Sequence, residues 1–193
     1  MFRLCCGMAF KIPESVLVVV HTPRLDVLVL ERTGTGLWQS VTGSREPDDP
    51  DLEATARREL REETGLAVGT LTDWRQTNRY EIWPQWRGRY APDVTHNVEH
   101  VFGFQVPDQT VATLDPAEHV AQLWLPWQEA MEKVFSPTNR DAIWQLQRRV
   151  LTKVSRRIPR CARGDNLVEM DAVRRCKNGV IQSVARDPCP GGL

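Results

Sequence analysis

The stretch DPDLEATARRELREETG, which runs from Asp49 to Gly65, carries six carboxylates and three arginines within seventeen residues. Asp49 is a good N-cap, Pro50 suits the first helical position, and Gly65 is a natural stop in the left-handed conformation. The sequence therefore predicts a helix from Pro50 to Thr64. The density of charge on this helix indicates either a solvated surface or a metal site.

The predicted helix has one apolar face and one acidic face. The apolar residues recur at i, i+4 and i+8, and they are Leu52, Ala56 and Leu60. Glu59, Glu62 and Glu63 share another face, where each like-charged pair costs roughly 0.2–0.5 kcal/mol. These three glutamates also lie in the last turn, at the negative end of the helix dipole, which disfavours them further. A helix selected only for stability would carry Lys or Arg there.

A hard divalent cation such as Mg²⁺ would cancel the repulsion between the three glutamates, and it prefers oxygen ligands of this kind. The alternative is an ordinary solvated face, on which Arg57, Arg58 and Arg61 screen the acids. For an anonymous helix the solvated face is the more common arrangement. The residues that flank this helix favour the metal site.

Strands and helices succeed one another along the body of the chain. Continuous β-branched runs predict buried strands, and a short apolar segment at 119–125 predicts a strand or a bend. Extended segments are expected at 15–22, 26–32, 71–83, 96–106 and 119–125. Helices are expected at 126–134, with Pro126 in the first turn, and at 136–151, which begins at Ser136 and Pro137. This order predicts an α+β layered domain.

Composition separates a body from two ends. The 193 residues carry no formal net charge, so the whole molecule has no basic field that would favour nucleic acid. Residues 155–193 hold eight Lys and Arg against four Asp and Glu and lack periodicity, so a disordered basic tail is expected there. A disordered extension is expected at 1–8, with Met8 as an alternative start, and the domain is expected at 9–154.

Cysteine usage and hydropathy indicate the compartment. No cysteine lies between Met8 and Arg160, which is typical of a cytoplasmic body without a disulfide framework. No apolar run approaches the roughly 18 residues that a membrane helix requires. His96, His100 and His119 lack the spacing of a zinc site, so they are expected to be structural or polar-surface residues.

The segment VTG, followed by RRELREETGL at 57–66, resembles the signature of the Nudix hydrolase family. That pattern is a glycine, a spaced glutamate, and then Arg-Glu-apolar-any-Glu-Glu-any-Gly-apolar. Its second half is matched without a gap by Arg58, Glu59, Leu60, Glu62, Glu63, Gly65 and Leu66. Gly43 matches the first glycine, but its spacing to Arg58 is one residue longer than in the pattern. Pro50 stands in the place of the first glutamate, so Asp49 or Asp51 is expected to substitute for it.

Further segments are similar to the bacterial dihydroneopterin triphosphate pyrophosphatase branch of this family, and they cover about residues 9–150. They are FKIPESVLVVVHT, LWQSVTGS, NRYEIWPQWRGRYAPDVTHNVEHVFGF, EHVAQLWL and SPTNRDAI. The resemblance implies a Nudix α/β/α sandwich with a mixed sheet and the signature loop-helix. It implies Mg²⁺-dependent hydrolysis, with Mn²⁺ as a second choice of ion, of dihydroneopterin triphosphate to the monophosphate and pyrophosphate in folate biosynthesis.

Two alternatives stay open beside this activity. The first is hydrolysis of (deoxy)nucleoside triphosphates or dinucleoside polyphosphates. The second is a non-catalytic nucleotide-binding module, which would have no need for three mutually repelling glutamates. In each case the expected partner is a small-molecule pterin or nucleoside triphosphate, with neither nucleic acid nor membrane, bound by a monomer or weak homo-oligomer.

The resemblance also implies roles for individual residues. The catalytic set would be Glu59 and Glu63 as metal ligands, Glu62 as a ligand or as the partner that activates water, and Glu118 as a ligand from outside the helix. Arg58 would pair with a helix carboxylate and fix its rotamer. The implied substrate contacts are Lys11, Arg32, Thr42, Tyr80, Glu81, Ile82, Trp83 and Ser136. Their chemistry agrees, because cations and helix starts bind phosphate and aromatic rings offer flat faces to a pterin.

Overall fold

The computed structural model describes the backbone of residues 10–157 and the side chains of residues 10–150. The first compact unit of the chain runs to Ser155. The predicted extension at 1–8 and nearly all of the predicted tail at 155–193 lie outside the described residues, so these two expectations stay predictions.

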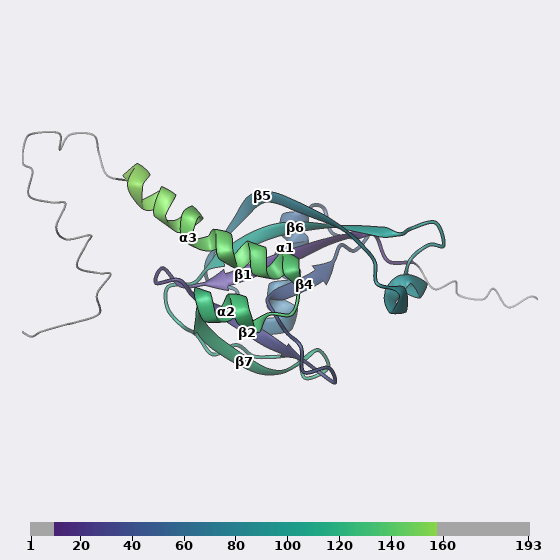
Figure 1. The fold of residues 1–193 in the computed structure, drawn as a ribbon, viewed down its shortest axis with the longest axis horizontal. Helices are drawn as coiled ribbons and strands as arrows, with labels where there is room; N and C mark the ends of the chain where they lie inside the picture. Colours follow the sequence, from purple (N-terminus) through teal and green to yellow (C-terminus); the bar gives the residue numbers. More distant parts are fainter. Residues whose placement is uncertain (1–9, 158–193) are drawn as a thin grey trace, which may run out of the picture. The chain divides into compact units, whose positions relative to one another are not determined.

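A mixed sheet of seven strands forms the centre of the described part of the chain (Figure 1). Its innermost strand is β1 (Glu14–His21), which pairs antiparallel with β2 (Asp26–Arg32) and β4 (Val41–Ser44). On its other side, β1 runs parallel to β6 (His96–Gln105). The continuous valine run of β1 is fully buried because packed side chains cover both faces of this strand.

The remaining strands extend the sheet on both sides of β1. β5 (Thr70–Glu81) pairs antiparallel with β6, and their register shifts between Asp73 and Gln76. β3 (Trp38–Gln39) and β7 (His119–Pro126) both pair antiparallel with β2. The uncertain segment at 119–125 is therefore a strand, and it brings its first residue beside the end of β2.

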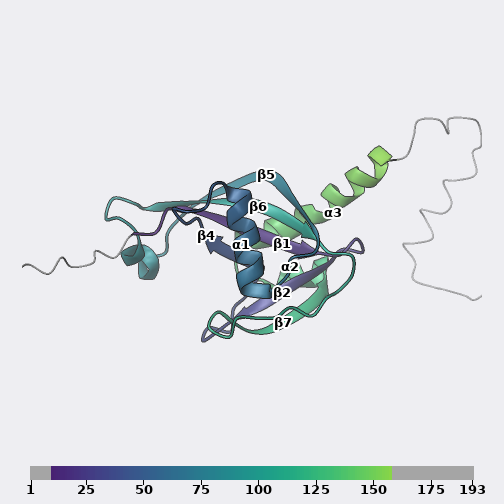
Figure 2. The ribbon, with the colours of Figure 1, turned by 180° about the vertical axis from the view of Figure 1, so that it is seen from behind.

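Helices cover both faces of the sheet, which confirms the predicted α/β/α sandwich. α1 (Leu52–Thr64) lies on one face, as Figure 2 shows, and α2 (Trp127–Lys133) and α3 (Pro137–Arg157) lie on the other, as Figure 1 shows. A short 3-10 helix, η1 (Pro84–Arg89), follows β5. The core under α1 includes Val16, Val18, Ala56, Leu60 and Phe104, and the core under α2 and α3 includes Leu17, Val19, Ala142, Ile143 and Leu146.

The start of α1 differs from the prediction. Asp51, not Asp49, is the N-cap, and its carboxylate accepts a hydrogen bond from the backbone N–H of Ala54 at 2.8 Å. The helix therefore begins at Leu52, and the prediction of Pro50 as its first residue is wrong. The predicted end is confirmed, because Gly65 has φ 66° and donates its N–H to the Arg61 carbonyl at 3.0 Å.

The two later helices also differ slightly at their ends. α2 begins at Trp127, so Pro126 precedes the helix instead of forming its first turn. α3 begins at Pro137, as expected, and continues to Arg157, six residues beyond the predicted end at 151. Among the described residues, no helix is both long enough and apolar enough to cross a membrane.

Candidate active site

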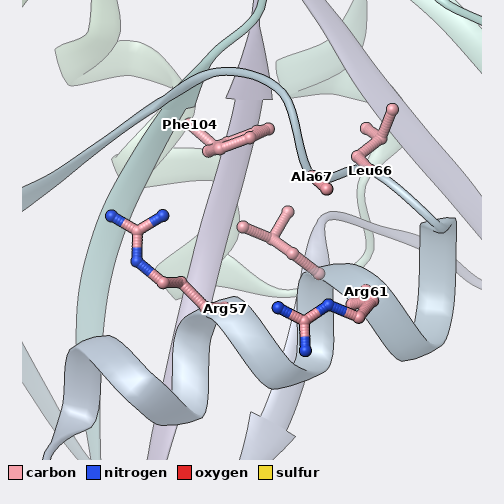
Figure 3. Close-up of a pocket in the computed structure, with 6 residues that line it drawn as sticks. Arg57, Arg61, Leu66, Ala67 and Phe104 are labelled. Atoms are coloured by element: carbon pink, nitrogen blue, oxygen red, sulfur yellow. The ribbon is translucent and has the colours of Figure 1, made fainter.

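The arginines and the glutamates of α1 face different surroundings. Arg57 and Arg61 lie beside a small hollow whose other labelled residues are Leu66, Ala67 and Phe104 (Figure 3). The Arg57 guanidinium pairs with the exposed carboxylate of Glu53 at 2.8 Å, which is an ordinary surface ion pair. Glu59 and Glu63 are buried instead and pack toward β4. Two of the three glutamates on the acidic face of α1 are therefore shielded from solvent.

The carboxylate of Glu59 lies directly against the backbone of Gly43. A methyl group added to Gly43 would stand 1.7 Å from Cδ of Glu59, a distance that no real side chain could tolerate. The glycine is thus required for space, and it explains why the signature begins with this residue type. Burial raises the pKa of Glu59 to about 7, against the opposing effect of Arg58, and the nearby Glu63 adds to the rise.

Glu63 is held from two sides in a nearly closed environment. His119 Nε2 lies 3.0 Å from Glu63 Oε2, and both side chains are almost completely buried. The backbone N–H of Thr42 also hydrogen bonds to this carboxylate. Burial raises the pKa of Glu63, and the His119 hydrogen bond works in the opposite direction. The tautomer that carries the proton on Nε2 donates this hydrogen bond to Glu63, and the contact fixes the rotamer of that carboxylate.

Arg58 ties the helix to the loop that precedes it. Its guanidinium donates to Glu59 Oε1 and Glu62 Oε2, each at 2.9 Å, and to the carbonyl of Ser44 at 2.9 Å. It also forks onto Asp49, with donor–acceptor distances of 3.2 and 3.0 Å. These hydrogen bonds hold the pKa of Asp49 down at about 2. The expected pairing of Arg58 with helix carboxylates is confirmed, and Asp49 is the aspartate that joins it.

Carboxylates from two distant segments meet at this end of the sheet. Ligand atoms of Glu63, Glu118 and His119 all lie within 4.8 Å of one another, and Glu118 is exposed. Glu62, in contrast, has a side chain that is 57% exposed and is paired with Arg58. Burial raises the pKa of Glu59 and of Glu63. A divalent cation that prefers oxygen ligands would relieve the repulsion between these carboxylates, and it fits this donor set.

Sequence reasoning placed His119 among the structural or surface histidines, and it missed this contact. His119 is 2% exposed and lies opposite Arg32 in the β2–β7 ladder. His119 is the first residue of β7 and is buried, whereas Glu118 lies in the turn before the strand and is exposed. The available signal was its adjacency to Glu118, which the resemblance already assigned to the site.

Three of the predicted substrate contacts lie around the acids. The Lys11 ammonium donates to Ser44 Oγ at 3.3 Å, and it experiences the charges of Glu59 and Glu118. Burial and the nearby Arg89 nonetheless lower the pKa of Lys11 below its ordinary value. Thr42 contacts Glu63 through its backbone, as described above. Arg32 ends β2 beside His119, and the next residue in the chain donates its N–H to the Glu118 carbonyl at 2.8 Å.

The aromatic contacts form a second group. Trp83 stacks on Trp86, with ring centroids 5.4 Å apart and planes inclined by 10°, and meets the Phe135 ring edge-on at 6.5 Å. Ser136 follows Phe135 in the chain, and the Tyr80 hydroxyl accepts from Asn97 Nδ2 at 3.1 Å. The structure therefore brings the Trp83 ring against Phe135, the residue that precedes Ser136 in the chain.

The other two predicted contacts have different surroundings. The side chain of Glu81 is exposed and pairs with the Arg87 guanidinium. Ile82 is 3% exposed and donates its backbone N–H to the Thr95 carbonyl at 2.9 Å. Their roles toward a substrate stay predictions.

Comparison with known proteins agrees with this geometry. The NUDIX domain family model matches residues 11–146. A dihydroneopterin triphosphate diphosphatase of Haemophilus influenzae is 37% identical over 142 residues, which cover 70% of this chain and 88% of that protein. The protein of that name from Escherichia coli is 38% identical over 142 residues, with 70% and 93% covered.

Solved structures show the same likeness. The structure of the E. coli dihydroneopterin triphosphate pyrophosphohydrolase superposes with a TM-score of 0.65 at 37% identity, and it covers 70% of this chain and 95% of that chain. A NUDIX hydrolase structure from Listeria monocytogenes, at 22% identity and a TM-score of 0.63, shares the fold.

Proposed function

The chain belongs to the NUDIX family, and on that premise we propose that it is a Mg²⁺-dependent pyrophosphohydrolase acting on dihydroneopterin triphosphate. Water would cleave the triphosphate to give dihydroneopterin monophosphate and pyrophosphate. The observation that carries the proposal is the pair of buried glutamates, Glu59 and Glu63, which α1 presses against β4 beside Glu118. The choice of substrate is supported by the names of relatives that share 37–38% of their residues with this chain.

In this proposal Glu59, Glu63 and Glu118 hold the ion, and Glu62 completes the set from its exposed position. When bound, the ion would neutralise the polyphosphate and polarise a phosphoryl oxygen. Arg58 keeps Glu59 and Glu62 in place and His119 keeps Glu63 in place, so both are proposed to act through the metal ligands. Loss of a residue that supports a metal ligand typically lowers activity or metal affinity by about 10- to 100-fold.

Lys11, Arg32 and Thr42 are proposed to receive the phosphates. Phosphoryl transfer spreads negative charge over the phosphoryl oxygens, so positioned cations stabilise the transition state electrostatically. Lys11 is suited to this role because it already lies in the field of Glu59 and Glu118. The reaction needs no nucleic acid, and we place it in the cytoplasm because the segment between Met8 and Arg160 lacks cysteine.

Pyrophosphate release from a panel of pterin and nucleoside triphosphates in the presence of Mg²⁺ tests the proposal. We expect the pterin triphosphate to be turned over with the highest kcat/KM. Equal turnover of ordinary nucleotides would refute the substrate, and turnover of nothing would favour a non-catalytic binding module. Glu63→Gln is expected to lower kcat by orders of magnitude, whereas the exposed α2 variant Glu132→Gln is expected to keep it.

A further inference from the structure

A cluster of buried polar side chains lies on the α3 side of the sheet, and the function of the acids does not use it. We define the polar cluster as Ser15, Asn78, Tyr80, Asn97 and Glu99. In the sheet register Glu99 is opposite Asn78 on β5 and Ser15 on β1, and Asn97 is opposite Tyr80. Residues opposite one another point to the same face, so the five side chains are neighbours. Their face is that of the buried Val101 and Leu17.

Glu99 is a buried carboxylate whose identified donors are neutral. It is 6% exposed, and it accepts from Asn78 Nδ2 at 3.0 Å and from the Thr138 hydroxyl. Burial raises the pKa of Glu99 above its ordinary range. A carboxylate has about four acceptor positions, so these two donors leave positions for a ligand. A buried carboxylate retained without a cation is costly unless further donors reach it.

Asn97 adds an acceptor that lacks a partner. Its Nδ2 donates to Ser15 Oγ at 2.6 Å and to the Tyr80 hydroxyl at 3.1 Å. Its Oδ1 is buried, and no donor reaches it within the described part of the chain. Buried polar atoms without partners are rare, and each points to a missing ligand or water. The polar cluster is therefore rich in acceptors and poor in donors.

The polar cluster lies between the predicted substrate contacts of the second group. The Thr138 hydroxyl that reaches Glu99 also hydrogen bonds to Ser136 at 2.9 Å. On the other side Tyr80 belongs to the cluster itself, and burial together with the nearby Glu99 raises the pKa of its hydroxyl. Trp83 is 48% exposed, and its ring contacts Phe135, which precedes Ser136 in the chain.

We propose that Glu99 and Asn97 select the heterocycle of the substrate by accepting hydrogen bonds from adjacent ring N–H and exocyclic NH₂ groups. This inference rests on the proposed function, because the 2-amino-4-oxo edge of a pterin carries these two donors side by side. Guanine carries the same pair, whereas cytosine and adenine place a bare ring nitrogen beside the amino group. A site built around acceptors rejects a base that lacks the donors, since its own acceptors are then left unpaired.

Substrate ratios test the proposal better than single rates. In Glu99→Gln, kcat/KM for dihydroneopterin triphosphate and GTP is expected to fall by about 10- to 100-fold, the range for a lost charge-assisted hydrogen bond. The loss for these two substrates is expected mainly as a higher KM. For CTP, the same variant is expected to keep kcat/KM within about twofold of the unsubstituted protein. Thr138→Val is the matched control, because it removes a neutral donor from the same carboxylate and should leave the GTP to CTP ratio unchanged.

The unsubstituted protein supplies a test that does not depend on the folding of a variant. Inosine triphosphate differs from GTP only by the missing 2-amino group, so GTP is expected to have at least about tenfold higher kcat/KM. Equal kcat/KM for these two nucleotides, or equal loss on GTP and CTP in Glu99→Gln, would overturn the inference. A low rate on the pterin triphosphate together with a preserved GTP preference would instead refute the proposed substrate and leave the recognition of this edge standing.

Discussion

Replacing Gly43 with alanine would separate the metal site from the stability of the fold. The backbone of Gly43 has no left-handed φ, so alanine can adopt its conformation without strain. The added methyl group would, however, stand 1.7 Å from Cδ of Glu59. Because Cδ lies near the end of the flexible Glu59 side chain, we expect the carboxylate to move and the backbone of β4 to keep its position.

The size of the effect follows from that displacement. Non-bonded carbon atoms keep about 3.5–4.0 Å between them, so the Glu59 carboxylate must retreat by roughly 2 Å. A misplacement of about 1 Å can already cost roughly 100-fold in rate, so Gly43→Ala is expected to lower kcat by at least about 100-fold. Stability should change by no more than about 1 kcal/mol, because the restriction of the unfolded chain by alanine opposes the loss of the Arg58–Glu59 hydrogen bond.

The assay combines turnover with thermal unfolding. Mg²⁺ is expected to raise the Tm of the unsubstituted protein and to have a much smaller effect on Gly43→Ala. Gly88→Ala is the matched control, because a methyl group there meets nothing within 4 Å. In the Glu59→Ala background the new methyl group finds empty space, so Gly43→Ala is expected to cost nothing further.

Two results would refute this reasoning. If Gly43→Ala keeps more than about a tenth of the normal kcat, contrary to the expected cost of misplacing a reacting group, then the position of Glu59 is not critical. If Gly43→Ala costs as much in the Glu59→Ala background as alone, its effect does not act through Glu59.

Three further predictions concern protonation and support of the acids. Burial raises the pKa of Glu59 from 4.5 to about 7, so the folded state binds this proton more tightly than the unfolded state does. The metal-free protein should therefore lose up to about 3 kcal/mol of stability as the pH rises from 4.5 to 7. Mg²⁺ affinity, read from the shift in Tm, should accordingly fall about tenfold per pH unit below pH 7; a pH-independent shift would contradict this. His119→Ala should lower Mg²⁺ affinity by about 10- to 100-fold, and His119→Gln, which keeps an N–H donor, should recover part of it; equal losses would point to packing alone. Asp51→Ala should cost about 1 kcal/mol of stability with kcat kept, whereas Asp49→Asn should lower kcat by releasing Arg58; the reverse pattern would exchange their roles.

Local pattern was sufficient for the parts of the site that lie within one element. The 3.6-residue period correctly placed Leu60 on the apolar face of α1, and it put Glu59 and Glu63 together on another face. The same period could not tell that Glu62 would stay exposed at the edge of that face, where it pairs with Arg58. Burial of a helix face depends on the strand beneath it, which the helix sequence does not contain.

The missed parts depend on contacts between distant segments. Asp49 and Asp51 both suit an N-cap, and the choice between them is made by the Arg58 guanidinium, which engages Asp49. His119 meets Glu63 across 56 residues of sequence, so its role appears only once β7 is paired with β2. Asn97 and Tyr80 likewise become neighbours only through the register of β5 and β6.

The short strand β4 joins the two halves of the site. Gly43 is paired with Val16 and faces α1 and Glu59, whereas Ser44 is paired with Ser15 and faces the side of the polar cluster. Lys11 hydrogen bonds to Ser44, and Asn97 hydrogen bonds to Ser15, the residue paired with Ser44. The acids and the acceptors of the polar cluster are therefore separated by a single residue step in β4. A substrate with phosphates at the acids and a heterocycle at the polar cluster must therefore cross this edge beside Lys11. Exchange of acceptors in the polar cluster should then change which base is selected while the acids, on the opposite face, keep their affinity for the ion.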